Sequence, residues 1–472
     1  MSRKKILLYN PKAVFFDMPL ALLSIGSMLD PNHYEVIIID ARVCKDPLKI
    51  IEQHNHDAIL FGVTALTGNP LRDALDTTRF VKKNYPHLIT IWGGWHPSLF
   101  PKQTLKDEPS IDITVQGQGE LTFRELVFNI ESKADLAHVA GITYRNQQNE
   151  IIQNEKRPLA DINQFTRINY DLINVEEYFR LKGRRQLDYI SSTGCFFRCS
   201  FCADPFVYKR KWTGIDPVTM VQDLEYWYHR LKFTDINFQD ETFFTYRNRI
   251  KELAVGLINK GIDSTWAGTM RADQGARMSE EDFDLCKKSG LRRVLIGVES
   301  GSQNMLNWLQ KDIKLEDVLL CARRCVERDI AVIFPFIVGF PNETDQSVQA
   351  SLEMAKVLNS MHPDFTTPIF YFKPYPGSKI TEEVLQAGYQ LPENLEAWTK
   401  FDYIGSSGPW VNNKKYQLIE LFKFYNKLGW SRKRTLLFPL QKMARWRINR
   451  SNYRWPVEKF LAEVFIPSKK LS

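Results

Sequence analysis

The chain reads Thr193-Gly-Cys-Phe-Phe-Arg-Cys-Ser-Phe-Cys-Ala-Asp204, which places Cys195, Cys199 and Cys202 within eight residues. A structural zinc site takes four protein ligands, but this stretch has no C-x-x-C partner or histidine pair close by. Two thiols are enough for a redox pair, so a third at this spacing has no part in that chemistry. An iron–sulfur cluster explains the number, because three thiolates hold three irons of a [4Fe–4S] cube and the fourth iron stays open to a small molecule.

Length and composition indicate a large intracellular protein. At 472 residues, 44% of them hydrophobic, the chain can form two or three domains. Its most apolar run, Ala331–Pro341, contains two prolines and a glycine and predicts a buried strand, not a membrane span. The charged, then strand-like start indicates no secretory signal, and seven cysteines indicate reduced thiols. We therefore expect a cytoplasmic location.

Strand-like and helix-like segments alternate over the first ~130 residues, which predicts a parallel, doubly wound sheet of the Rossmann type. Helical patterns cover Leu20–Leu29 and Arg72–Lys83. The expected strands are Ile6–Tyr9, Tyr34–Ile39, Ala58–Val63, Leu88–Trp92 and Ile113–Val115. Ligands of such sheets bind in the loops at the carboxyl ends of the strands.

A second βα series begins at Leu187, after a polar segment that predicts a hairpin and linker. Six βα units predict a partial barrel with its chemistry at the strand ends. The expected strands are Asp188–Ser191, Ile236–Gln239, Ser264–Gly268, Arg293–Gly297, Val332–Val338 and Thr367–Phe372. We expect an α/β chain with these boundaries: first domain 1–135, linker 136–182, partial (β/α)6 barrel 183–385, and helical, basic C-terminal region 386–472.

The cysteine stretch resembles the radical S-adenosylmethionine (SAM) superfamily. The signature of that family is C-x3-C-x2-C on the loop after the first barrel strand, with an aromatic residue before the last cysteine, and Phe201 fills that position here. The resemblance implies that the three cysteines hold a [4Fe–4S] cluster and that SAM chelates the open iron. Electron transfer would then cleave SAM to methionine and a 5′-deoxyadenosyl radical. The cofactors supply the chemistry, so we assign no catalytic side chain.

Later strand ends carry weaker matches to the same family. The second-strand motif would bind the amino group of SAM through its acidic pair, although such a pair also caps helices. An arginine after the third strand offers a planar fork for a carboxylate, and the fourth-strand motif would bond ribose hydroxyls. With Phe201, the residues that the resemblance implies for SAM are Asp240, Glu241, Arg271, Glu299 and Ser300.

A doubly wound domain before such a barrel resembles the cobalamin-binding members of the superfamily. The motif D-x-H-x-x-G, whose histidine ligates cobalt in other cobalamin proteins, is absent, as it commonly is in these members. His96 is either a ligand or a structural loop residue, and the alternative for the whole domain is that it no longer binds cobalamin. The residues that the resemblance implies for cobalamin are Asn10, Asp40, Thr64, Gly93, Gly94, His96, Gly117 and Glu120.

The other cysteines look structural. Cys321 and Cys325 are four residues apart and share a helix face. Such a pair is able to hold a metal, but two core thiols are the simpler interpretation. Residues 1–150 contain a single cysteine, Cys44, which argues against the second cluster of a methylthiotransferase.

The net charge of +8 lies largely in the C-terminal region, where aromatic residues alternate with arginines and lysines. This pattern fits an anionic membrane, a nucleic acid or a solvated helical cap. We do not expect nucleic acid, because no RNA-binding module is recognised. The aromatic residues are Phe438, Trp446, Trp455, Phe460 and Phe465.

We therefore expect an anaerobic, cobalamin-dependent radical SAM enzyme. The resemblance covers methyltransferases and also the anaerobic magnesium-protoporphyrin ester cyclase. A non-catalytic sensor is disfavoured, because it would not need the SAM motifs at the strand ends. We expect a hydrophobic small-molecule substrate (a lipid, polyprenoid or tetrapyrrole), an electron donor such as flavodoxin or ferredoxin, and contact of the C-terminal region with the inner face of the membrane.

Overall fold

The computed structural model describes residues 3–14, 16–401, 408–430, 438–454, 456 and 458–459. The chain folds into two units. The first comprises Met1–Trp266 and Pro374–Asp402, and the second comprises Ala267–Lys373 and Tyr403–Ser472. The C-terminal segment thus returns to the first unit for a short stretch before it completes the second.

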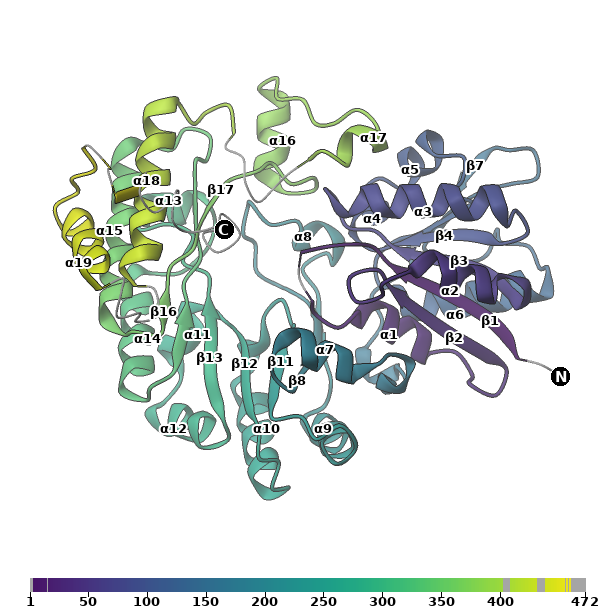
Figure 1. Cartoon of the computed structure of the whole chain (residues 1–472), viewed down its shortest axis with the longest axis horizontal. Helices are drawn as coiled ribbons and strands as arrows, with labels where there is room; N and C mark the ends of the chain where they lie inside the picture. Colours follow the sequence, from purple (N-terminus) through teal and green to yellow (C-terminus); the bar gives the residue numbers. More distant parts are fainter. Residues whose placement is uncertain are drawn as a thin grey trace. The chain divides into compact units, whose positions relative to one another are not determined.

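The first unit begins with a parallel sheet, as expected. Its strands are β1 (Lys4–Asn10), β2 (Tyr34–Asp40), β3 (Ala58–Thr64), β4 (Ile89–Gly93), β5 (Ile113–Val115), β6 (Ile142–Arg145) and β7 (Ile151–Gln153). The order within this seven-stranded sheet is β2-β1-β3-β4-β5-β6-β7, and Figure 1 labels β1 to β4 and β7. β1 to β5 are parallel, while the expected hairpin, β6 and β7, is antiparallel and extends the sheet beyond β5.

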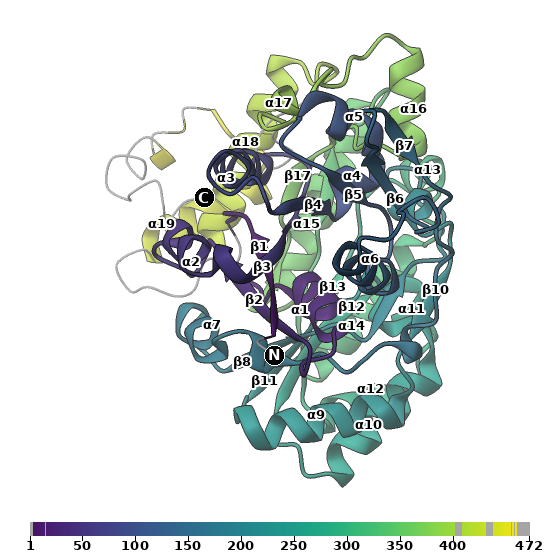
Figure 2. The same ribbon diagram turned by 90° about the vertical axis from the view of Figure 1, so that its right-hand side faces the viewer.

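Helices cover both faces of this sheet (Figure 2). They are α1 (Leu20–Ser27), α2 (Pro47–His54), α3 (Pro70–Asn84), α4 (Trp95–Leu99), α5 (Pro101–Asp107) and α6 (Glu120–Ser132), with a short 3-10 turn at Asn55–Asp57. α2, α3 and α5 pack on one face, and α1 and α6 pack on the other. The sequence of α3 explains why this segment forms a helix that packs on the sheet. Pro70 fits the first helical position, and Leu71, Ala74 and Leu75 form a buried stripe at helical spacing.

The first unit also contains the start of the barrel. Its strands are β8 (Gln186–Tyr189), β9 (Ser192–Gly194), β10 (Trp212–Gly214) and β11 (Asp235–Phe238). β8 and β11 are parallel, and β9 and β10 form an antiparallel hairpin whose connection carries the three cysteines. The helices are α7 (Val175–Lys182), α8 (Asp204–Val207), α9 (Pro217–Leu231), α10 (Arg247–Asn259), α16 (Lys379–Gln386) and α17 (Leu395–Trp398), with 3-10 turns at Ile162–Gln164, Tyr170–Leu172 and Phe243–Thr245.

The second unit continues the βα series. The chain enters it within β12 (Thr265–Met270). The further strands are β13 (Leu291–Ile296), β14 (Ala331–Ile333), β15 (Phe336–Val338), β16 (Phe365–Thr366) and β17 (Ile369–Tyr371). The helices are α11 (Ala272–Arg277), α12 (Glu280–Lys288), α13 (Gln303–Trp308), α14 (Leu315–Glu327), α15 (Asp345–Met361), α18 (Asn413–Gly429) and α19 (Phe438–Asn449).

Prolines interrupt the last two barrel positions. The expected strand Val332–Val338 is broken at Phe334-Pro335, between β14 and β15, and the expected strand Thr367–Phe372 contains only β17, which a break at Thr367-Pro368 separates from β16. Proline has no N–H to donate to a neighbouring strand, so the hydrogen-bond ladder ends there. The halves pair separately, β14 with β16 and β15 with β17, both in parallel.

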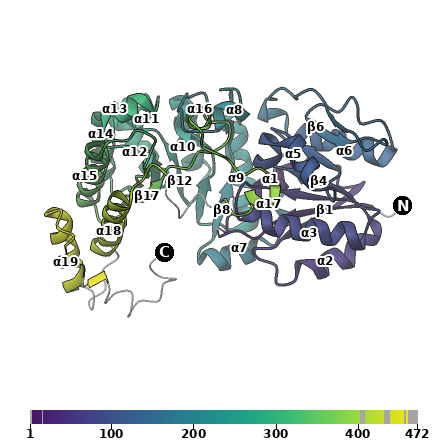
Figure 3. The ribbon, with the colours of Figure 1, turned by 90° about the horizontal axis from the view of Figure 1, so that it is seen from above.

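The helical C-terminal region is described in part. α19 lies beside α18 (Figure 3). Trp455, Phe460 and Phe465 of the aromatic, basic tail lie outside the described residues. Among the helices that are described, none combines the length and the apolar character needed to cross a bilayer.

Candidate functional site

A cavity of about 560 Å³ lies at the carboxyl edge of the first sheet. Its volume falls within the roughly 300–1,000 Å³ typical of ligand pockets. The edge is the topological switch point of the order β2-β1-β3, where doubly wound sheets bind ligands. Six of the eight residues expected to contact cobalamin line this cavity: Asn10, Thr64, Gly93, Gly94, Gly117 and Glu120.

Glycines shape this edge of the cavity. Gly94 has φ +100° and ψ −164°, a conformation that is essentially restricted to glycine. A Cβ added there would lie 3.0 Å from the carbonyl oxygen of Ala65. Gly117 has φ +71°, and a Cβ there would meet no atom within 4 Å. Gly94 therefore lets the loop after β4 run close to the backbone of Ala65, and Gly117 leaves open space beside the loop after β5, as a broad, flat ligand requires.

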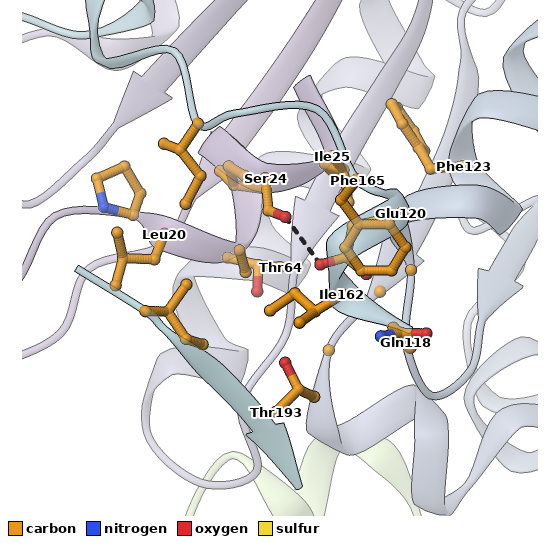
Figure 4. Close-up of a pocket in the computed structure, with 18 of the residues that line it drawn as sticks. Leu20, Ser24, Ile25, Thr64, Gln118, Glu120, Phe123, Ile162, Phe165 and Thr193 are labelled. Atoms are coloured by element: carbon orange, nitrogen blue, oxygen red, sulfur yellow. Dashed lines mark hydrogen bonds between the residues drawn. The ribbon is translucent and has the colours of Figure 1, made fainter. Parts of the chain in front are cut away.

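Glu120 places a half-buried carboxyl group in the lining. Glu120 opens α6, and the hydroxyl of Ser24 in α1 donates a hydrogen bond of 2.8 Å to its Oε1 (Figure 4). Burial raises the pKa of Glu120. The surrounding side chains are largely apolar and include Leu20, Ile25, Phe123, Ile162 and Phe165. The cavity therefore combines a largely apolar wall with an oriented carboxyl group at Glu120.

The same cavity reaches the start of the barrel. Tyr189 ends β8, Thr193 lies in β9, and both line it together with Tyr208 from the cysteine-bearing connection. Trp95, from the loop after β4, packs edge-on against Tyr208 with ring centroids 6.1 Å apart. The loops of the first sheet and the cysteine hairpin thus share one chamber within the first unit.

Asp40 and His96 lie outside the described cavity lining. The carboxylate of Asp40 is buried and bonded to the guanidinium of Arg42, with Nη2 at 2.6 Å, and to the hydroxyl of Tyr178 at 2.7 Å. His96 is 1% exposed and packs between Phe100 and Trp398. Both side chains therefore stabilise loops next to the cavity without lining it.

His96 is held as a neutral imidazole. Its Nδ1 lies 3.3 Å from Oγ1 of Thr67, and its buried Nε2 has no hydrogen-bond partner. Burial lowers the pKa of His96 to about 3. No histidine is among the described residues that line the cavity.

The three cysteines share one tight loop. The N–H of Cys202 donates to the carbonyl of Cys199 at 3.2 Å, and all three thiols are half-buried. Phe201 is half-buried beside Cys202. Burial, the nearby Asp204 and the other two thiols all raise the pKa of the Cys202 thiol well above its usual value. Three such thiolates need a cationic centre, so the donor set fits an iron–sulfur cluster.

Two elements hold this loop in place. Gly194 has φ +87°, and a Cβ there would lie 2.3 Å from the carbonyl oxygen of Lys211 across the hairpin. The N–H of Ile380, at the start of α16, donates to the carbonyl of Ser200 at 3.0 Å. The returning segment 374–402 therefore braces the cysteine loop.

Asp240 anchors the strand that leads to the cysteines. Its carboxylate is 2% exposed and accepts the Ser191 N–H at 2.8 Å, the Ser191 hydroxyl at 2.6 Å and the Ser192 hydroxyl at 2.5 Å. Arg249 donates to the carbonyl of Ser191 at 2.7 Å. Asp240 thus binds the N–H of Ser191 and Arg249 binds its carbonyl, so the backbone just after β8 is fixed at both groups. The sequence did not predict this role for Asp240.

Glu241 faces a different environment. It is half-buried, and its Oε2 is a buried atom without a hydrogen-bond partner. Burial, and then the charge of Asp204, raise the pKa of Glu241 to about 8. Asp204 lies two residues after Cys202. Since its charge acts on Glu241, the unpartnered Oε2 of Glu241 lies close to the cysteine loop.

The remaining residues expected to contact SAM lie in the second unit and are bonded there. Arg271 donates from Nη2 to the carbonyl of Lys311 at 2.6 Å and from Nε to Asp273 at 2.9 Å. Glu299, at φ +66°, pairs with Lys311 at 2.7 Å. The hydroxyl of Ser300 lies 3.2 Å from that of Ser351. In this structure each one stabilises its own strand end.

Sequence reasoning missed several contributors. Trp95 lies within the segment Gly93–Pro97, where the sequence predicted a role only for the glycines and the histidine. Tyr208 and Arg249 lie outside the motifs quoted for this family, and only tertiary contacts show their place. Cys321 and Cys325 are fully buried in α14, consistent with core thiols.

Comparison with known proteins identifies the family. The family model of the radical SAM superfamily matches residues 189–355, and that of the B12 binding domain matches residues 12–127. The chain is a radical SAM enzyme with a B12-binding domain. This membership confirms the [4Fe–4S] cluster, SAM and cobalamin as its cofactors. The cavity and the cysteine loop are compatible with that set.

Curated relatives cover most of the chain. An uncharacterized methyltransferase of Pyrococcus horikoshii is 28% identical over 390 residues, which is 81% of this chain and 82% of the relative. The anaerobic magnesium-protoporphyrin IX monomethyl ester cyclase of Synechocystis is 28% identical over 344 residues, 71% of this chain and 67% of the relative.

Solved structures share the fold. The cobalamin-dependent SAM radical enzyme OxsB, with aqua-cobalamin and SAM bound, superposes with a TM-score of 0.75 at 17% identity over 94% of this chain and 72% of its own. The radical SAM methyltransferase TsrM of Kitasatospora setae, with cobalamin and a [4Fe–4S] cluster, superposes with a TM-score of 0.67 at 18% identity over 83% of this chain and 76% of its own. The α/β architecture expected from the sequence is thereby confirmed.

Proposed function

We propose that this protein is a cobalamin-dependent radical SAM methyltransferase that methylates an unactivated carbon of a hydrophobic small molecule. The observation that carries the proposal is the single cavity whose wall runs from the glycine loops of the B12-binding domain to Thr193 and Tyr208 beside the cysteine loop. A methyl donor and a radical generator must address the same substrate carbon, so they need a common chamber.

The chain's residues have distinct roles in this proposal. When bound, the cluster with SAM supplies a radical and cobalamin supplies a methyl group. Cys195, Cys199 and Cys202 hold the cluster, and the unpartnered oxygen of Glu241 accepts from the amino group of SAM. Ser24 orients Glu120 toward an amide-rich ligand. The apolar wall excludes water from the reacting carbon.

The rest of the expected SAM and cobalamin sets stays part of the proposal. Arg271, Glu299 and Ser300 would act from the second unit, each after release from its protein partner. Asp40 and His96 would act indirectly, by supporting cobalamin-binding loops. The proposed division into 1–135, 136–182, 183–385 and 386–472 is supported by the two family matches, which fall inside the first and third parts.

A hydrophobic substrate is supported by the apolar lining of the cavity. The reaction also needs an electron donor, for which we propose a flavodoxin or ferredoxin. The proposed location is the cytoplasm, where thiols stay reduced, and the uneven count of seven cysteines supports it. Contact with the inner face of the membrane, where a lipid, polyprenoid or tetrapyrrole substrate dissolves, belongs to this proposal.

A cyclase or oxidoreductase is the second candidate. The magnesium-protoporphyrin ester cyclase of Synechocystis has the same 28% identity as the Pyrococcus methyltransferase, although over 344 residues and not 390. The two activities differ in what they consume. Methyl transfer consumes two molecules of SAM: one loses its methyl group and becomes S-adenosylhomocysteine, and the other is cleaved to methionine and 5′-deoxyadenosine. Radical cyclisation without methyl transfer forms methionine and 5′-deoxyadenosine but no S-adenosylhomocysteine.

Anaerobic reconstitution tests the proposal. The protein is purified with cobalamin supplied, and its corrin absorbance is recorded before SAM and a reductant are added. We expect corrin bands, 5′-deoxyadenosine and S-adenosylhomocysteine, with Cys199→Ala as the control that yields no 5′-deoxyadenosine. Absence of 5′-deoxyadenosine from the wild type refutes the radical enzyme. Absence of corrin bands favours a domain that only shapes the active site, and absence of S-adenosylhomocysteine favours the cyclase.

A further inference from the structure

One side of α19 exposes large apolar side chains. Ala444 and Ile448 are buried on the inner side of the helix, against the rest of the second unit. On the other side Phe438 is 56% exposed, Met443 44% and Trp446 49%. In water, exposed apolar side chains of this size gathered on one helix mark a binding surface more often than a solvated one.

The same side of α19 is cationic. Lys442 and Arg445 are exposed in the helix, and Arg450 is exposed directly after it. The helix contains no aspartate or glutamate, and within the described residues none of these three cations forms an ion pair. Arg447, in contrast, turns inward and pairs with Glu458 at 2.7 Å. We define the α19 outer face as Phe438, Lys442, Met443, Arg445, Trp446 and Arg450.

Helical geometry makes this a single face. At 100° per residue the six positions fall within an arc of about 160°, with the cations and the apolar side chains interleaved. A helix with aromatic and other apolar side chains between lysines and arginines has the composition of an interfacial membrane helix. Tryptophan sits at the level of the lipid headgroups, and lysine and arginine pair with phosphates.

We propose that the α19 outer face docks the enzyme on an anionic lipid bilayer. The three cations pair with lipid phosphates, and Phe438, Met443 and Trp446 enter the headgroup region. A nucleic acid also attracts the cations, but the thioether of Met443 gains nothing from contact with phosphates and is favoured in an apolar layer. This proposal specifies which surface makes the membrane contact of the proposed function. It rests on the proposed function only for the reason why the enzyme would bind a membrane.

Vesicle sedimentation tests the docking with the full-length, reconstituted protein. Vesicles of phosphatidylglycerol and phosphatidylcholine are compared with vesicles of phosphatidylcholine alone at about 0.1 M salt, where charges still act over about 10 Å. We expect preferential binding to the anionic vesicles. Since each cation near such a surface contributes about 1 kcal/mol, Lys442→Gln with Arg445→Gln should weaken binding roughly 30-fold.

Matched variants separate this face from net charge. Lys288→Gln with Arg323→Gln removes the same charge from exposed positions of α12 and α14, and it should bind within about twofold of wild type. Trp446→Ser should weaken binding at unchanged net charge. Near-UV circular dichroism verifies that each variant is folded.

Three results would overturn the docking. They are equal binding of wild type to both kinds of vesicle, equal loss in the α19 and control variants, and tight binding to single-stranded RNA with none to lipid. Formation of 5′-deoxyadenosine is measured in the same samples and tests the proposed reaction independently of docking. Loss of docking with intact SAM cleavage would leave the enzyme assignment standing.

Discussion

Acidification should destabilise the first unit through His96. The pKa of this buried imidazole is about 3, against about 6.5 for histidine in an unfolded chain. A depressed pKa in the folded state contributes stability that is fully present above pH 6.5 and is lost as the pH falls toward 3. Linkage gives a loss of about 2 kcal/mol between pH 7.5 and pH 5, and an upper limit of about 5 kcal/mol at lower pH.

Urea unfolding of the cofactor-free chain measures this loss. His96→Gln removes the titrating group, so its free energy of unfolding should fall by about 2 kcal/mol less than that of wild type between pH 7.5 and pH 5. Comparison of the two pH differences cancels the fixed cost of the substitution. His229→Gln, at an exposed position of α9, is the matched control. If wild type and His96→Gln lose equal stability, the reasoning about the buried ring is refuted.

Cobalt spectroscopy checks the location of the same residue. Because His96 does not line the described cavity, the paramagnetic resonance spectrum of the cob(II)alamin-loaded protein should be the same in wild type and His96→Gln. A nitrogen splitting that disappears in the variant would show that His96 ligates cobalt.

Three further substitutions test the site. Cys199→Ala should abolish SAM cleavage and the iron–sulfur absorbance, while Cys325→Ala, in the core of α14, should retain both. Gly94→Ala should cost about 2 kcal/mol of stability and reduce cobalamin retention on gel filtration, because its backbone conformation is a glycine one. Asp240→Ala should lower the free energy of unfolding by about 3 kcal/mol, since it leaves a buried amide and two serine hydroxyls without their acceptor. The exposed Asp263→Ala should change it by less than about 0.5 kcal/mol.

Local patterns predicted most of the fold. Apolar runs located β1 to β5 within two residues at each end, because strand formation in a buried parallel sheet depends on local apolar content. The same patterns missed the breaks at Pro335 and Pro368, although both prolines were visible. A run of apolar residues signals burial, while the hydrogen-bond ladder depends on which N–H groups exist.

The candidate site was predictable where its residues are close in sequence. The prediction that Cys195, Cys199 and Cys202 lie together in one loop needed only their spacing. Asp240 was expected to face SAM, but its acceptors are taken up by Ser191 and Ser192. An acidic pair at a strand end looks the same in sequence whether it faces a ligand or its own backbone, because that depends on the neighbouring strand.

The sequence by itself determined the family and the order of the βα units, and it predicted the three cysteines as cluster ligands, since these depend on short-range spacing. Only the tertiary structure decided that Asn10, Thr64, Gly93 and Gly117 meet at one cavity, and that this cavity continues to Thr193 and Tyr208. Parallel strands bring their carboxyl ends to one edge however far apart they lie in the chain. The tertiary structure also decided that Asp40 and His96 do not line the cavity but pack against Arg42 and Trp398, because the direction of a side chain is set by packing and not by its position in a motif.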